Sequence, residues 1–145
     1  MRYRCLLIAA LLMIAAVAAR PASATPAFAT TFKKDYVDSL EDKKFAEEVS
    51  KGTNKCFACH QGKKSRKNRN AFGLELSKLI KKDQKDPEKI SAAIKKAFAM
   101  HVDPKDDKSE TYLDRWKANK WPAGKLEDLM KEPATPAADA VDEKK

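Results

Sequence analysis

Residues 56–60 have the sequence Cys-Phe-Ala-Cys-His (CFACH), and this stretch carries the most specific chemistry in the chain. It holds two of the three cysteines and one of the two histidines among the 145 residues. Two thiols and an imidazole at this spacing can hold a zinc ion, form a redox-active disulfide or attach a haem. The surrounding sequence helps to choose between these chemistries.

The chain begins with the features of a secretory signal peptide. Two arginines in the first four residues precede an uncharged apolar run over 5–19, and small residues follow it. Ala22-Ser23-Ala24 fits the cleavage site best, and Ala27-Phe28-Ala29 is the second choice. The run is short for a membrane span, which needs about 20 residues, although an uncleaved anchor stays open. Cleavage after Ala24 would define a signal peptide over 1–24 and remove Cys5 with it.

The remaining chain is expected to be one domain over 25–132 with a disordered tail over 133–145. Three arginines leave with the signal peptide, so the net charge falls from +9 to about +6, with 27 basic against 21 acidic residues. This lysine excess suits redox partner proteins with an acidic surface. Nucleic acid is not expected, because no binding motif is present. No second apolar run could span a membrane, so we expect a periplasmic or otherwise exported protein.

Apolar spacing and helix signals predict an all-α domain of four or five helices. After a loose lead over 25–31, the predicted helices cover residues 32–51 with a break near Ser39, 70–80, 87–101, 110–120 and 125–131. Asn70 and Asp86 are the expected N-caps of the second and third helices, and Pro87 occupies a first helical position. Gly73 inside a helical pattern indicates close approach of the backbone to a bulky neighbour.

A Cys-x-x-Cys-His pentad is the attachment signal of c-type haem. In this interpretation Cys56 and Cys59 form thioether bonds to the haem vinyl groups, and His60 binds the iron as proximal ligand. Covalent attachment takes place outside the cytoplasm, so the signal peptide supports this interpretation independently. A small exported domain often needs a disulfide, metal or cofactor as a staple, and the pentad is the candidate for it. We therefore expect the helices to fold around one covalently bound haem.

Three other uses of the pentad stay open. A zinc site from Cys56, Cys59, His60 and His101 would have four ligands, but ligands adjacent in sequence suit a tetrahedral site poorly. A thioredoxin-like dithiol would need a βαβ setting, which the sequence pattern lacks. A structural disulfide between the two cysteines would close a very small loop and stabilise little. Haem is favoured over all three.

The second axial position of the iron has three candidate residues, His101, Met100 and Met130, and an open site is a further alternative. At 100° per residue, His101 falls about 20° from Ile90 on the apolar stripe of its predicted helix, whereas Met100 falls about 80° away. We therefore favour His101 and place Met100 second. Two imidazoles would give an electron carrier of lower potential than a Met/His pair, whereas an open site would admit a small gas.

Apolar residues near these ligands are candidates for the haem wall, and ordinary helix–helix core is their alternative. Phe72, Phe98 and Trp116 are the residues predicted to contact the haem. The basic run over 63–69 is either a solvated loop or a surface that pairs with propionates or steers an acidic partner.

Residues 55–82, KCFACHQGKKSRKNRNAFGLELSKLIKK, and 86–124, DPEKISAAIKKAFAMHVDPKDDKSETYLDRWKANKWPAG, resemble small single-haem c-type cytochromes of planctomycete bacteria. The group includes the heterodimeric cytochrome pair of anammox organisms. The resemblance implies a helical, cytochrome c-like fold, a haem held by the pentad, and a homo- or heterodimer. Members of the anammox pair use a distal Cys and bind gases such as nitric oxide. This chain departs from them, because its only spare cysteine is Cys5 in the signal peptide.

Taken together, these features predict an exported monohaem c-type cytochrome that carries single electrons between redox proteins. No base or nucleophile constellation accompanies the pentad, so we do not expect an enzyme. The alternative is a subunit that binds nitric oxide or carbon monoxide at a haem, or regulates through it. A zinc-stapled structural module is the third hypothesis.

Overall fold

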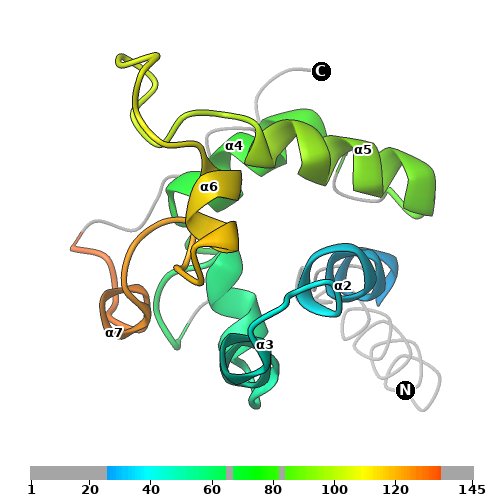
Figure 1. Ribbon diagram of the computed structural model, residues 1–145, viewed down its shortest axis with the longest axis horizontal. Coiled ribbons are helices and arrows are strands. Elements are labelled where there is room, and N and C mark those ends of the chain that lie inside the picture. Colours follow the sequence, from blue (N-terminus) through cyan, green and yellow to red (C-terminus); the bar gives the residue numbers. More distant parts are fainter. Residues whose placement is uncertain (1–25, 65–66, 82–83, 135–145) are drawn as a thin grey trace, which may run out of the picture.

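The computed structural model describes residues 26–64, 67–81 and 84–134, and this part of the chain is mostly helical (Figure 1). The signal peptide predicted over 1–24 and nearly all of the tail predicted over 133–145 lie outside the described residues. In chain order, the structure contains α2 (Pro26–Phe32), the π-helical turn η2 (Lys33–Val37), α3 (Lys43–Ser50), the 3₁₀ turn η3 (Asn54–Ala58), α4 (Ala71–Leu79), α5 (Pro87–Phe98), α6 (Tyr112–Lys117) and α7 (Leu126–Leu129).

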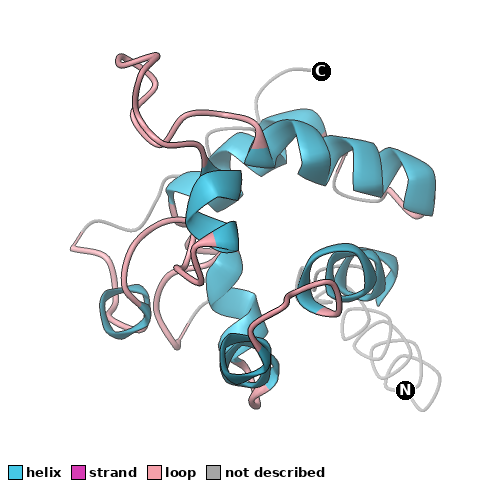
Figure 2. Cartoon of the chain, viewed as in Figure 1, coloured by secondary structure: helices cyan, strands magenta, loops and turns pink. Residues whose placement is uncertain are grey.

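The described residues contain no strand, and loops join the helices (Figure 2). Two isolated antiparallel bridges pair His60 with Arg69 and His101 with Thr111. The all-α prediction is confirmed, but the described part has six α-helices where the sequence predicts four or five. None of these helices is long and apolar enough to cross a bilayer.

Helix α2 corrects the prediction for the start of the domain. The loose lead predicted over 25–31 is wrong for its described part, because α2 begins at Pro26. The fixed φ of proline suits the first turn of a helix. The rings of Phe28 and Phe32 stack with their centroids 6.3 Å apart, and Phe32 is buried. This aromatic packing extends the helix to the N-terminal side of the predicted boundary.

The break predicted near Ser39 is confirmed. The π-helical turn η2 ends where the Asp38 amide donates to the Lys33 carbonyl at 2.9 Å. Helix α3 then begins after Asp42, whose carboxylate accepts hydrogen bonds from two amides of the first turn at 2.8 and 3.1 Å. An aspartate N-cap of this kind starts a new helix, because its own backbone is extended and its carboxylate accepts from the amides of the first turn.

Helix α5 begins as predicted and ends earlier. Asp86 caps it with its carboxylate, and Pro87 follows. The helix ends at Phe98 instead of near His101, because the chain turns into a bridge in which the Met100 carbonyl accepts from a backbone amide at the start of α6, at 3.0 Å. His101 therefore lies beyond α5, and the helical stripe that favoured it over Met100 does not extend that far.

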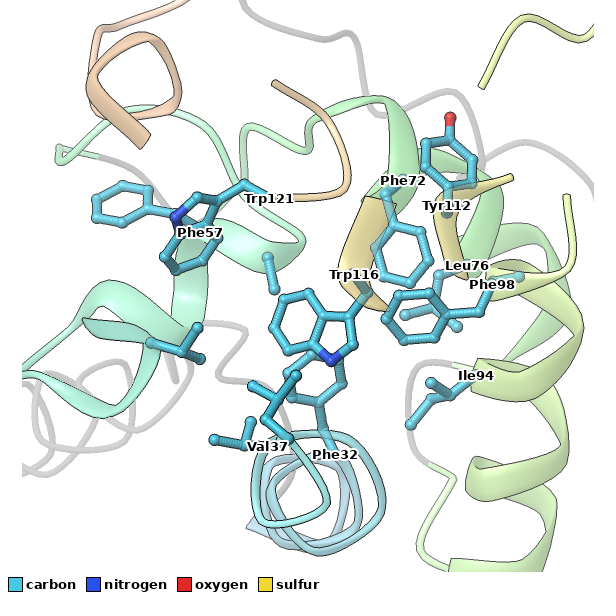
Figure 3. Packing of buried hydrophobic residues seen from close by; sticks show 14 of the residues in the cluster. Phe32, Val37, Phe57, Phe72, Leu76, Ile94, Phe98, Tyr112, Trp116 and Trp121 are labelled. Atoms are coloured by element: carbon cyan, nitrogen blue, oxygen red, sulfur yellow. The ribbon is translucent and has the colours of Figure 1, made fainter. Parts of the chain in front are cut away.

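Phe98 packs against several other rings in the aromatic part of the hydrophobic core (Figure 3). Its ring centroid lies 4.5 Å from that of Tyr36 and 4.6 Å from that of Phe72. The rings of Phe32 and Trp116 lie 6.4 and 5.9 Å from it. These contacts join α5 to α2 on one side and to α4 on the other. The core therefore fixes where α4 begins, and the start of α4 faces the pentad.

Gly73 lets α4 approach the pentad closely. A Cβ atom at this position would overlap the backbone carbonyl of Cys59. The close approach predicted from the sequence is confirmed, and the neighbour in this structure is the backbone of the pentad itself.

We predict that Gly73→Ala destabilises the domain by about 1–3 kcal/mol, the usual cost of overpacking. The sign is diagnostic, because Gly→Ala inside an unobstructed helix stabilises by about 0.5–1 kcal/mol. Urea unfolding followed by circular dichroism measures the effect. Lys78→Ala on the exposed side of α4 is the control and should change stability by less than about 0.5 kcal/mol. A stabilised Gly73→Ala protein would contradict the close packing.

Candidate functional site

The pentad forms one tight turn at the end of η3. The amides of Cys59 and His60 both donate to the Cys56 carbonyl, at 3.2 and 2.9 Å. Phe57 and Ala58 are buried, whereas the two cysteines and the histidine are partly exposed. The apolar pair in the middle thus anchors the turn in the core, and the three chemically active residues lie at its edge.

Asn70 holds this turn against the first turn of α4. Its side-chain oxygen accepts from the Gly73 amide at 2.9 Å, which confirms the predicted N-cap. Its side-chain nitrogen donates to the carbonyls of Phe57, Ala58 and His60 at 2.8, 3.2 and 3.3 Å. The sequence predicts the cap but not these three bonds, because no local pattern marks contacts with residues ten or more positions earlier in the chain.

A backbone carbonyl orients the His60 ring. The Nδ1 atom lies 3.2 Å from the Asn68 carbonyl oxygen. Because a carbonyl only accepts hydrogen bonds, the neutral imidazole carries its proton on Nδ1 in this contact and its lone pair on Nε2. Metal-binding histidines commonly use this arrangement, in which the bond at the second nitrogen fixes the ring and raises its basicity.

His101 has the same local arrangement as His60. Its Nδ1 is hydrogen bonded to the Ser109 carbonyl, and in both cases the carbonyl lies eight residues beyond the histidine. Each histidine also takes part in an isolated backbone bridge with the segment that supplies the carbonyl. The neutral His101 imidazole therefore also has its lone pair on Nε2. The other ligand candidates, Met100 and Met130, are partly buried and pack against the core.

Phe72, Phe98 and Trp116, the predicted haem contacts, lie together in the aromatic core (Figure 3). Each is at most 2% exposed, and they pack on one another and on neighbouring rings. Contact between these side chains and a haem stays a prediction. A surface pocket of about 500 Å³ is lined by residues from the end of α4, the segment after it and α5, and no residue of the pentad lines it.

The last described residues hold the loop that follows the pentad. The Glu132 carboxylate accepts hydrogen bonds from the amides of Lys63 and Lys64, both at 2.9 Å. The Gly62 amide donates to the Leu129 carbonyl at 2.8 Å. Sequence reasoning treated this basic run as a loop and missed both contacts, because their partners follow α6 far along the chain.

The zinc and dithiol alternatives gain no support from the geometry. No three His, Cys, Asp or Glu side chains of the described residues form a group that could hold a metal ion, so the four candidate zinc ligands are not brought together. Cys56 and Cys59 are free thiols. Burial raises the pKa of Cys59 to about 12, Cys56 adds to this rise, and Arg69 opposes it. Because the attacking group of a redox-active dithiol is a thiolate, the raised pKa of Cys59 disfavours this cysteine in that role.

Comparisons with known proteins find no relative of the chain. No family model, curated protein or solved structure matches it.

We predict that the two thiols of the haem-free protein react at very different rates. With a pKa of about 12, Cys59 is thiolate in only about one molecule in ten thousand at pH 8. Iodoacetamide labelling with fragment-ion mapping should find Cys56 modified first, and Cys59 labelling should quicken about tenfold per pH unit. Equal labelling of both thiols in the folded protein would contradict this, and urea-unfolded protein is the control in which they should react alike.

The same pKa shift sets a pH dependence of folding. A thiol whose folded pKa is raised stabilises the fold fully below its unfolded pKa of about 8.5, and this contribution is lost as pH rises toward about 12. In the haem-free protein, the urea midpoint should therefore fall across this alkaline window, and Cys59→Ser should flatten the decline.

Proposed function

We propose that this protein is an exported monohaem c-type cytochrome that carries single electrons between redox proteins. When bound, the haem supplies a one-electron ferric/ferrous couple. Cys56 and Cys59 would hold it by thioether bonds, and Nε2 of His60 would bind its iron. The resemblance to small planctomycete cytochromes supports the same assignment.

One observation carries the proposal: two free thiols and an oriented imidazole share a single turn. The shared Cys56 carbonyl fixes the backbone of the turn, and the Asn68 carbonyl holds the His60 ring in the tautomer whose lone pair is on Nε2. This donor set fits a covalently attached haem with a proximal histidine.

His101 is the residue that we propose for the second axial position. The matching carbonyl contacts of the two histidines support it, since both rings are held at Nδ1 and have the Nε2 lone pair for a metal. Met100 is the second choice. Two imidazole ligands would favour electron transfer at a lower potential than a Met/His pair. Phe72, Phe98 and Trp116 would exclude water from the apolar side of the site.

The remaining features fit a carrier that works outside the cytoplasm. The sequence of residues 1–24 is that of a signal peptide, and the lysine excess suits an acidic partner surface, which would speed encounter at low salt. A homo- or heterodimer is part of the proposal through the resemblance alone.

Attachment of one haem is the primary test. Protein exported from a host with a cytochrome maturation system should be coloured and should exceed the mass of the processed polypeptide by one haem. Cys56→Ser and Cys59→Ser should each keep one thioether bond, and the double variant should lose the covalent haem. A colourless wild-type protein at the bare polypeptide mass would refute the proposal.

The distal ligand is tested by visible and near-infrared spectra of His101→Ala beside Met100→Ala. We expect His101→Ala to lose the low-spin signature and to bind carbon monoxide readily, and Met100→Ala to behave like the wild type. The reverse result would assign Met100. A wild-type protein whose Soret band shifts at once with carbon monoxide would favour the gas-binding alternative over a carrier.

A further inference from the structure

The carbonyl that orients His60 belongs to the loop between His60 and Asn70, whose two ends are joined by a backbone bridge between His60 and Arg69. The Asn68 carbonyl accepts from the Gln61 amide at 3.0 Å and faces Nδ1 of His60 at 3.2 Å. The described parts of this loop are basic and, apart from Gly62 and Asn68, largely exposed. Beyond this bridge, the loop also makes contacts with a segment far along the chain.

Glu132 supplies those contacts. Its carboxylate accepts from two consecutive backbone amides, those of Lys63 and Lys64, each at 2.9 Å. Hydrogen bonds between a carboxylate and backbone N–H groups are charge-assisted and about twice as strong as neutral ones. The second carboxylate oxygen lies 3.5 Å from the side-chain nitrogen of Asn68, the residue whose carbonyl faces His60.

Gly62 adds independent support for this packing. Its φ is +82°, a conformation that favours glycine, and a Cβ atom there would overlap the Glu132 carboxylate. Its amide donates to the Leu129 carbonyl at 2.8 Å, so the loop is also joined to the end of α7. The sequence therefore has a glycine at the place where the carboxylate must come close.

We propose that Glu132 is a positioning residue for the proximal histidine: it fixes the loop so that the Asn68 carbonyl accepts from Nδ1 of His60. This rests on the proposed function, in which Nε2 of His60 binds the haem iron. A hydrogen bond at Nδ1 raises the basicity of the imidazole and favours the ferric state. Loss of the Glu132 contacts weakens that bond and raises the reduction potential.

The test uses the full mature chain with Glu132→Ala, Glu132→Gln and the control Glu127→Gln. Glu127 lies on α7 and carries the same charge, and none of the described hydrogen bonds joins it to the loop. Glu132→Gln keeps one acceptor oxygen. This variant replaces Glu132→Ala in the test if Glu132→Ala fails to fold. In haem-free protein, hydrogen exchange of the Gln61, Lys63 and Lys64 amides should quicken about tenfold or more in Glu132→Ala, less in Glu132→Gln, and not in Glu127→Gln.

The haem-loaded proteins separate a positioning role from a merely structural one. We expect the His60 Nδ1–H resonance to shift and the potential to rise in both Glu132 variants, and to stay near wild type in Glu127→Gln. A haem-loaded Glu132→Ala protein with unchanged potential and resonance overturns the positioning role alone, even if its loop amides exchange faster. A wild-type protein that holds no haem overturns the proposed function first, and the positioning role with it.

Discussion

The side chain of Asn70 makes the contacts on which the rest of the site depends. The oxygen of this side-chain amide caps α4 by accepting from the Gly73 amide, and its nitrogen donates to three carbonyls of the neighbouring turn. A different side chain at this position would not easily make all four bonds. An unpaired buried carbonyl or amide costs about 1–3 kcal/mol. The aromatic core fixes the position of α4, and the hydrogen bonds of Asn70 hold the Cys56–His60 turn against the start of α4. The chemistry of Cys56–His60 is thus positioned by the hydrophobic core through one polar side chain.

The sequence allows the helix starts to be predicted better than the helix ends. Asn70 and Asp86 are N-caps whose signal lies within three residues of the bonds they make, so local reasoning found both. The end of α5 at Phe98 depends on a bridge to the segment before α6, which no local pattern contains. The start of α2 depends on the stacking of Phe28, which a periodicity count beginning at Phe32 omits.

The residues of the candidate site also divide into those that a local sequence pattern predicts and those that it does not. Cys56, Cys59 and His60 lie within five consecutive residues, so the sequence alone indicates that they act together. The groups that hold them are the side chain of Asn70 and the backbone carbonyls of Cys56 and Asn68, and a backbone carbonyl leaves no residue-type signal. His101 was favoured from a helical stripe that ends before it, yet the structure gives it a different form of support in the Ser109 carbonyl. The contact of Phe72, Phe98 and Trp116 with a haem stays a prediction, and the structure shows that these rings are buried and pack on one another.

The contact between Glu132 and the loop after the pentad has a consequence for the order in which the protein folds and matures. Glu132 follows Lys63 by 69 residues, and a chain that crosses a membrane from its N-terminus delivers the two thiols well before this carboxylate. In the proposed export, the cysteines would belong during that interval to an incompletely folded chain, in which burial would not yet raise the pKa of Cys59. A maturation enzyme that acts during translocation would therefore encounter two thiols of similar reactivity on an incompletely folded chain. The Glu132 contacts would then form after haem attachment and stabilise the loop.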